Sequence, residues 1–118
     1  AIATAAIPRI TECQPQDLGN ISWSFARLGV SNMPLFNAIS SQSLAMLSHF
    51  RPQNFVNIAW AFATLQVEHD TLLSSISEEA RRKIKEFNPQ NFSNLAWAFA
   101  TLGVVDCPLL SALSAAAI

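Results

Sequence analysis

Three copies of a short polar strip carry the side chains with which this chain could recognise a partner. Glutamine and asparagine dominate the strips, and amide side chains both donate and accept hydrogen bonds. The positions are spaced i, i+1, i+4, i+8 and i+11, which places them on one side of a helix. We therefore predict a recognition face. Its members are Gln16, Asp17, Asn20, Ser24 and Arg27 in the first copy, Gln53, Asn54, Asn57 and Thr64 in the second, and Gln90, Asn91, Asn94 and Thr101 in the third, with Ala61 and Ala98 in place of Ser24.

Two kinds of position exist within the strips. Asn20, Asn57 and Asn94 are identical in all copies. An amide that never changes is better suited to satisfying backbone groups between stacked helices than to reading a partner. The positions that vary, 17, 24 and 27 with their counterparts, are the better candidates for partner recognition.

No constellation typical of catalysis or metal binding occurs in the sequence. His49 and His69 are isolated, and no phosphate-binding loop, nucleophile elbow or pair of catalytic carboxylates is present. The one basic run, 81–85, is flanked by glutamates and is expected to lie on a solvated helix with i,i+4 ion pairs. We predict that the protein is not an enzyme and needs no cofactor and no metal.

The three strips can form one face only if helices hold them in register, and the chain contains a repeating unit that would do so. Trp23, Trp60 and Trp97 stand 37 residues apart, and the residues around them repeat with the same spacing. A fixed period in this range is typical of stacked copies of one supersecondary unit. Such an array offers a long surface rather than a pocket, which also argues against an enzyme.

Each unit is predicted to contain two helices. Gly29 and Gly103 follow the first helix, where a left-handed residue is favoured, and Gln66 at the equivalent place is expected to carry a small strain. Asp70 is expected to cap the second helix of the middle unit. The first helices are predicted to begin at Pro15, Pro52 and Pro89, and the second helices near Pro34, Thr71 and Pro108.

The predicted fold class is all-α: an α-solenoid of antiparallel helix pairs that repeats every 37 residues. Residues 1–118 are one helical-repeat segment, with a half repeat at 1–13, full repeats at 14–50 and 51–87, and a partial repeat at 88–118. We expect an excerpt of a longer array.

The repeated aromatic residues are predicted to form the structural core of the repeat. They are Trp23, Phe25, Trp60, Phe62, Trp97 and Phe99. With Trp60 packed from both sides, its replacement by alanine is expected to cost roughly 3–5 kcal/mol. The alternative is that the tryptophans are exposed and stack on nucleic-acid bases.

Composition limits the possible partners and compartments. The net charge is −1 and only 13% of the residues are charged, so a strongly basic nucleic-acid surface is absent. Apolar residues make up 51% of the chain, yet no run approaches the roughly 20 residues that span a bilayer. Cys13 and Cys107 occupy non-equivalent repeat positions, and we expect both to be reduced, as in an intracellular or organellar compartment.

The repeat resembles the octotricopeptide repeat. The residues that carry the resemblance are Pro-Gln-x-Leu/Phe-x-Asn-x-x-Trp-x-Phe-Ala-x-Leu-Gly, in register three times over residues 15–118. The resemblance implies an α-solenoid of a protein imported into chloroplasts or mitochondria, with the targeting segment outside this stretch. It also implies binding of single-stranded RNA, about one nucleotide per repeat, in RNA processing, stability or translation.

Two functions remain open from the sequence. The first is the RNA-binding module that the resemblance implies, with contacts along the first helix of each unit. The second is a protein-binding scaffold subunit of a large organellar assembly such as a ribosome or a photosynthetic complex, which the low charge and high apolar content favour. In neither case is a small-molecule substrate expected, and membrane contact is expected only through such a complex.

Overall fold

The structure, a computed structural model, describes residues 7–103, 111 and 115, and this part of the chain contains helices and no strand. The predicted all-α class is confirmed for it. The elements are the short 3-10 helices η1 (Ile7–Glu12), η2 (Leu47–His49) and η3 (Ile84–Glu86), and the α-helices α2 (Pro15–Leu28), α3 (Met33–Met46), α4 (Pro52–Thr64), α5 (Asp70–Arg82) and α6 (Pro89–Thr101).

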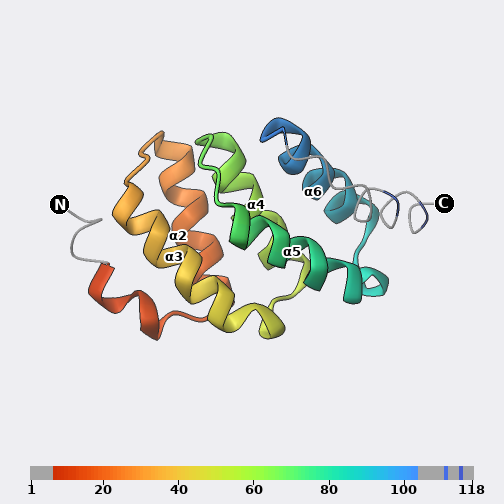
Figure 1. Cartoon of the computed structure of the whole chain (residues 1–118), viewed down its shortest axis with the longest axis horizontal. Helices are drawn as coiled ribbons and strands as arrows, with labels where there is room; N and C mark the ends of the chain where they lie inside the picture. The colour runs from red at the N-terminus through yellow and green to blue at the C-terminus, as the bar shows by residue number, and fades with distance from the viewer. Residues whose placement is uncertain (1–6, 104–110, 112–114, 116–118) are drawn as a thin grey trace.

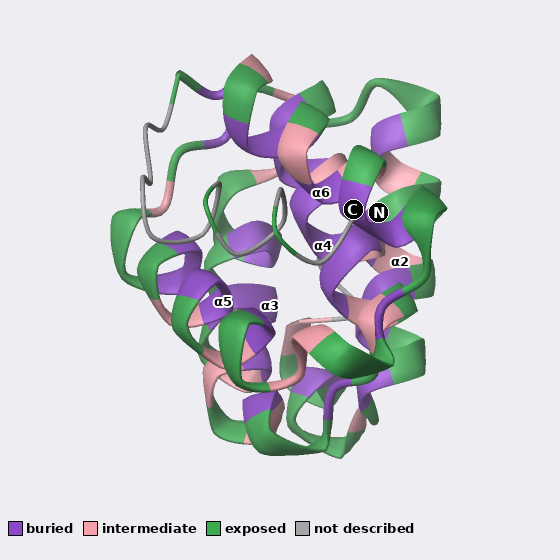
Figure 2. Cartoon of the chain, turned by 90° about the vertical axis from the view of Figure 1, so that its right-hand side faces the viewer, coloured by how far each residue is buried: buried purple, intermediate pink, exposed green. Residues whose placement is uncertain are grey.

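The helices form two layers. Helices α2, α4 and α6 follow one another along the long axis, with α4 in contact with both neighbours. Helices α3 and α5 lie beside each other and cover one side of this row (Figure 1). Viewed along the long axis, the buried residues face the interior between the two layers (Figure 2). The first helix of each unit therefore has another first helix as its neighbour in one layer, and the second helices α3 and α5 form the other layer.

Proline fixes where each first helix begins. Helices α2, α4 and α6 start at Pro15, Pro52 and Pro89, as predicted, because the first amide of a helix has no internal partner to lose. The starts of these three helices keep the 37-residue spacing of the sequence.

The second helices begin one residue earlier than predicted. Helix α3 starts at Met33 and α5 at Asp70, while Pro108 lies outside the described residues. The prediction that Asp70 caps α5 is wrong: the Leu72 N–H donates to Nδ1 of His69 at 3.3 Å, so histidine occupies the capping position. Asp70 is instead the first helical residue, where a negative charge stabilises the helix dipole.

A run of phenylalanines connects the units at the base of the helix row. Phe50, Phe55, Phe87 and Phe92 follow one another with ring centroids 5.3, 6.1 and 5.7 Å apart. All four side chains are buried. The Phe50–Phe55 and Phe87–Phe92 pairs join successive units, and the Phe55–Phe87 pair connects the two ends of the middle unit.

Side chains in α3 and directly after α5 also hold the turn that precedes a first helix. Gln42 Nε2 donates to the carbonyl oxygens of Thr11 and Cys13 at 3.3 and 3.1 Å. Lys83 Nζ donates to the two corresponding carbonyls 37 residues further along the chain, both at 2.7 Å. These carbonyls precede the helix-starting prolines, so the contacts satisfy backbone groups that the turn leaves without a partner.

Cys13 is a free, half-buried thiol. Burial raises the pKa of this thiol above its ordinary value, and the nearby carboxylates of Asp17 and Glu12 add to the effect because they disfavour a thiolate. The expectation for Cys107 falls outside the described residues.

A left-handed residue ends each first helix. Gly29 and Gly103 have φ of 71° and 73°, and Gln66 takes their place after α4 with φ of 56°. A residue with a side chain pays about 1–2 kcal/mol for this conformation. Gln66 recovers part of this cost because its Nε2 donates to the Ala63 carbonyl oxygen at 3.0 Å.

Replacement of Gln66 by glycine is expected to raise the free energy of unfolding by about 0.5–1 kcal/mol. The relief of backbone strain exceeds the loss of one part-buried hydrogen bond and the added freedom of the unfolded chain. Urea denaturation followed by circular dichroism measures the change. Gln66→Ala is the control, since it keeps the strain and loses the hydrogen bond, so it should be less stable than the natural chain. Equal stability of Gln66→Gly and Gln66→Ala would contradict a strained backbone at this position.

Candidate functional site

The solvent-facing residues of the three first helices form one surface across the row. On each helix they occupy positions i, i+4, i+7 and i+11, which share one side. None of the twelve is buried. We name this the amide–tryptophan surface. It consists of Gln16, Asn20, Trp23 and Arg27 on α2, Gln53, Asn57, Trp60 and Thr64 on α4, and Gln90, Asn94, Trp97 and Thr101 on α6.

Most of the predicted recognition strip lies on this surface. The structure brings together its glutamines, the invariant asparagines, and Arg27, Thr64 and Thr101. The other strip positions are those of Asp17 and Ser24 and their counterparts in the second and third units. They lie on the side of each first helix that faces the preceding unit.

Asp17, Asn54 and Asn91 close the N-termini of their own helices. Each accepts a hydrogen bond from the backbone N–H three residues earlier, at 3.0, 2.8 and 3.1 Å respectively. This is half of a capping box and satisfies an amide that the first turn leaves free. Their predicted role in the strip is therefore corrected: the acceptor oxygen faces the chain's own backbone, and Asn91 is buried.

Ser24 is itself exposed, but its position is a packing position in the next two units. Its counterparts Ala61 and Ala98 are fully buried between neighbouring helices. Ser24 is exposed because no helix of the described chain covers that side of α2. The small side chains at this position, serine in the first unit and alanine in the next two, allow neighbouring helices to approach closely.

The tryptophans are not core residues. Trp23 and Trp97 are 42% and 47% exposed, and Trp60 is half-buried. The prediction of a buried tryptophan core is wrong for the two outer copies, because their tryptophans lie on the solvent-facing side of the helix row. Phe62 and Phe99 are buried as expected of a core, whereas Phe25 is half-buried.

Trp23 and Trp60 already contact each other across the helix boundary. Their ring centroids are 6.0 Å apart with the planes inclined at 31°. The Arg27 guanidinium lies 5.2 Å from the centre of the Trp23 ring, within the range of a cation–π interaction. Together they form a partly exposed aromatic pair with a positive charge over the Trp23 ring.

Amide groups between the tryptophans and the helix starts are linked to one another. Gln53 Nε2 donates to Asn57 Oδ1 at 2.8 Å, and Asn91 Nδ2 donates to Gln53 Oε1 at 3.4 Å. Gly19 allows the close approach of α2 to this network, since a Cβ placed there would lie 3.2 Å from the Asn57 Cβ. These contacts fix the orientation of the middle amides and leave Asn20 and Gln90 exposed.

The amide–tryptophan surface is almost uncharged. Arg27 is the one charged residue among its twelve members. The basic run of the sequence lies on the other layer, where Arg82 pairs with Glu78 at 3.0 Å and Glu79 at 3.6 Å. The expected solvated helix with i,i+4 ion pairs is confirmed for Arg82, while Lys83 is committed to backbone carbonyls.

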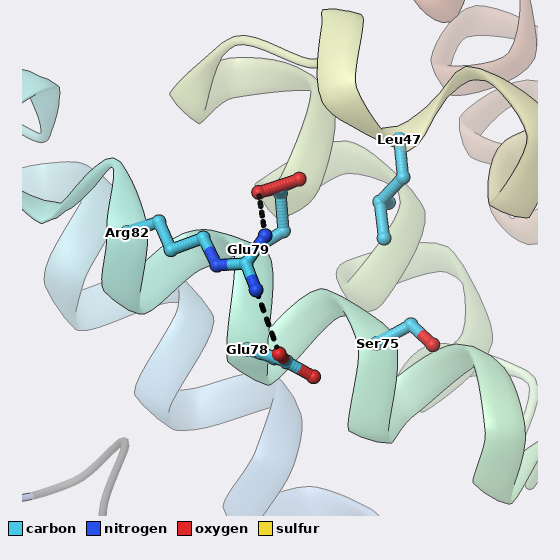
Figure 3. Close-up of a pocket in the computed structure, with 5 residues that line it drawn as sticks. All are labelled: Leu47, Ser75, Glu78, Glu79 and Arg82. Carbon is cyan, nitrogen blue, oxygen red and sulfur yellow. Dashed lines mark hydrogen bonds and ion pairs between the residues drawn. The ribbon is translucent and has the colours of Figure 1, made fainter.

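The same ion pairs line a small depression of about 180 Å³ between η2 and α5 (Figure 3). Arg82 lies between the two glutamates, and Leu47 and Ser75 face them across the opening. Its one cation, Arg82, is paired with the glutamates. Its one hydroxyl, that of Ser75, has no histidine or lysine beside it among these five residues. The depression therefore has no arrangement suited to catalysis.

The described part of the chain contains no group of three or more His, Cys, Asp or Glu residues able to hold a metal ion. Over the same residues, no helix combines the length and hydropathy that crossing a membrane requires.

The fold and the surface together define a class of protein: a helical protein with a solvent-facing row of amides and tryptophans. Residues 1–116 match the family model of the RNA-editing substrate-binding complex 6 protein, and the chain belongs to this family. A comparison with curated proteins gave no match. The family match agrees with the organellar, RNA-associated part of the resemblance noted above, but it does not specify the octotricopeptide repeat.

Proposed function

We propose that this chain is a non-catalytic module that binds single-stranded RNA through the amide–tryptophan surface, as a component of an RNA-editing substrate-binding complex. The proposal rests on one observation: tryptophans repeat in register on the solvent-facing side of three first helices, exposed in α2 and α6 and half-buried in α4, each with an amide one turn away. The name of the family supplies the kind of RNA involved, a substrate of editing.

Stacking is the interaction that this surface is best built to make. Base–aromatic stacking contributes about 1–3 kcal/mol per base and tolerates any sequence. Trp23 and Trp97 keep 42% and 47% of their surface exposed, and their neighbours Asn20 and Asn94 can hydrogen-bond to base edges. Such contacts require unstacked bases, which single strands supply and duplexes do not.

Sequence preference would come from the one position of the surface that varies. Arg27 of the first unit corresponds to Thr64 and Thr101 in the next two, while the glutamine, asparagine and tryptophan positions are identical. The second and third units are therefore proposed to accept the same base, and the first a different one.

The proposed architecture is a section of an α-solenoid with units at 14–50 and 51–87, flanked by the half repeat 1–13 and the partial repeat 88–118. The regular helix starts and the position of α4 between α2 and α6 support it. We place the protein in an organelle. Of the two organelles considered above, RNA editing favours the mitochondrion, and nothing supports the chloroplast.

RNA binding is expected to depend weakly on salt. Affinity for single strands falls with salt with a slope of about −0.7 per phosphate neutralised, and the surface carries one cation, Arg27. Fluorescence anisotropy with a labelled single-stranded RNA from 50 to 200 mM salt should give a slope near −0.7 for the natural chain. Arg27→Thr, which copies the second and third units, should bring the slope close to zero.

The matched control is a duplex of the same RNA, which should bind much more weakly. Absence of single-strand binding would reject the proposal, as would a duplex bound equally well. A slope several times steeper would place the RNA on the basic residues of α5 instead.

A protein-binding scaffold is the second candidate, and a specific observation favours it. Leu28, Val30 and Met33 are large apolar side chains that remain 75%, 42% and 47% exposed. Crosslinking of the native complex distinguishes the two functions. Crosslinks from the amide–tryptophan surface to protein alone, without RNA, would make the chain a scaffold.

A further inference from the structure

The two junctions between first helices differ at the tryptophans. At the α2–α4 junction the Trp23 and Trp60 rings are in contact, with centroids 6.0 Å apart. Trp60 and Trp97 occupy the equivalent places at the α4–α6 junction, and these two residues, both in the described part of the chain, make no such ring contact. Both junctions lie between helices of the described chain, so the difference is independent of whatever covers the outer sides of α2 and α6.

One position beside the tryptophans also differs between the junctions. Gly19 lies one turn before Trp23 and lets α2 approach α4 closely, since a Cβ there would lie 3.2 Å from the Asn57 Cβ. The equivalent residue at the α4–α6 junction is Val56, whose side chain is only 3% exposed. A valine fills space that Gly19 leaves to the neighbouring helix, which disfavours the same close approach beside the tryptophans of the second junction.

Ring contact decides whether a nucleobase can enter. Trp23 is engaged by the Trp60 ring and by the Arg27 guanidinium, which lies 5.2 Å from its centre. Trp60 has Trp23 on the side of α2, but on the side of α6 no ring of a described residue contacts it. Each base of a stacked strand takes up roughly 3.4 Å along the stack. Two rings already in contact therefore leave no room for a base, whereas two rings out of contact can admit one.

We propose that a nucleobase of single-stranded RNA inserts between Trp60 and Trp97 and stacks on both rings, while the Trp23–Trp60 pair stays closed. This insertion site rests on the proposed RNA binding, and it specifies where on the amide–tryptophan surface a base is held from two sides.

The amides beside the two rings fit this arrangement. Asn94 lies one turn before Trp97 and forms no side-chain hydrogen bond with another described residue, so its donor and its acceptor can meet the edge of the inserted base. Its counterpart Asn57 is different, because its Oδ1 accepts a hydrogen bond from Gln53 Nε2 at 2.8 Å. We therefore expect the Asn94 amide to contact the edge of the base.

Trp60 tests the site because it is the least exposed of the three tryptophans. If bases stacked only on the more exposed rings, Trp60 would be dispensable for binding. Trp60→Leu keeps an apolar side chain in the row and removes the aromatic face. It is expected to weaken binding of the labelled single-stranded RNA by about fivefold or more, which corresponds to the lower limit of about 1 kcal/mol for one stacked base. Trp60→Phe is the matched control: it keeps an aromatic face and should bind like the natural chain.

A double-mutant cycle separates one shared base from two independent contacts. If one base touches both rings, loss of either ring removes most of the gain. The combined effect of Trp60→Leu and Trp97→Leu on Kd should then fall short of the product of the single effects by about twofold or more, since residues that share a partner are coupled by at least about 0.5 kcal/mol. In the matched cycle, Trp23→Leu with Trp97→Leu, the rings hold separate bases and the effects should multiply. Fluorescence anisotropy gives each Kd, and circular dichroism checks that the variants remain helical.

The outcomes distinguish the insertion site from the proposed function. A natural chain that binds no single-stranded RNA would reject both together. RNA binding that Trp60→Leu leaves unchanged, or that Trp60→Phe weakens as much as Trp60→Leu, would overturn the insertion site alone. So would a Trp60–Trp97 cycle whose effects multiply as those of the Trp23–Trp97 cycle do.

Discussion

Replacement of Phe62 by alanine is expected to lower the free energy of unfolding by about 3–5 kcal/mol, the range for deletion of a fully buried phenylalanine. The Phe62 side chain has no exposed surface, and its ring meets Phe36 edge-on with centroids 5.2 Å apart. Helix α4 is covered on both sides by α2 and α6, so little can collapse into the cavity. Urea denaturation followed by circular dichroism, at one fixed protein concentration, measures the loss.

Phe25→Ala is the matched control because Phe25 occupies the same position in the first unit. Its side chain is only half-buried, since no helix of the described chain covers that side of α2. The expected loss is below about half of that for Phe62, in proportion to the apolar surface removed from water. Equal losses at the two positions would mean that the first unit is as well covered as the middle one.

Trp60→Ala is now expected to cost less than the 3–5 kcal/mol inferred from the sequence. That figure assumed a tryptophan enclosed from both sides. In the structure Trp60 contacts Trp23 on one side but keeps part of its ring in solvent. Since the loss scales with buried area, Phe62 and not Trp60 is the residue on which the middle unit depends most.

The helix register followed from the sequence because three in-register copies fix it without any knowledge of packing. The prolines at the starts of α2, α4 and α6 and the left-handed residues Gly29 and Gln66 lie where the period placed them. Helix α5 starts near Thr71 as predicted, but its N-cap was predicted wrongly. Aspartate is the more frequent cap, but the His69 ring reaches the Leu72 N–H in this chain.

The site was harder to predict, because a helical projection shows which residues share a side of the helix but not what that side faces. Asp17 and Ser24 were grouped with the recognition strip as polar residues, yet Asp17 closes its own helix, and the counterparts of Ser24 in the next two units are buried between helices. The tryptophans were assigned to the core because they are large and apolar. Their spacing from the strip, three residues after Asn20 and four before Arg27, already placed Trp23 on the solvent-facing side.

Removal of both exposed tryptophans, as Trp23→Ala with Trp97→Ala, is expected to weaken binding of single-stranded RNA by about 30-fold or more. Each stacked base is worth about 1–3 kcal/mol. Two such losses amount to at least about 2 kcal/mol, and every 1.4 kcal/mol corresponds to a factor of ten in affinity. Fluorescence anisotropy with the labelled RNA described above measures the change in Kd.

The control for this double variant is the pair of phenylalanine substitutions, Trp23→Phe with Trp97→Phe, which keeps an aromatic face at each position. It should retain affinity within several-fold of the natural chain. Because both side chains are nearly half exposed, neither double variant should lose much stability, and thermal unfolding verifies this. If alanine and phenylalanine weakened binding equally, an aromatic ring would not be what RNA requires here. If neither changed the affinity, RNA binding would have to be assigned to another surface of the chain.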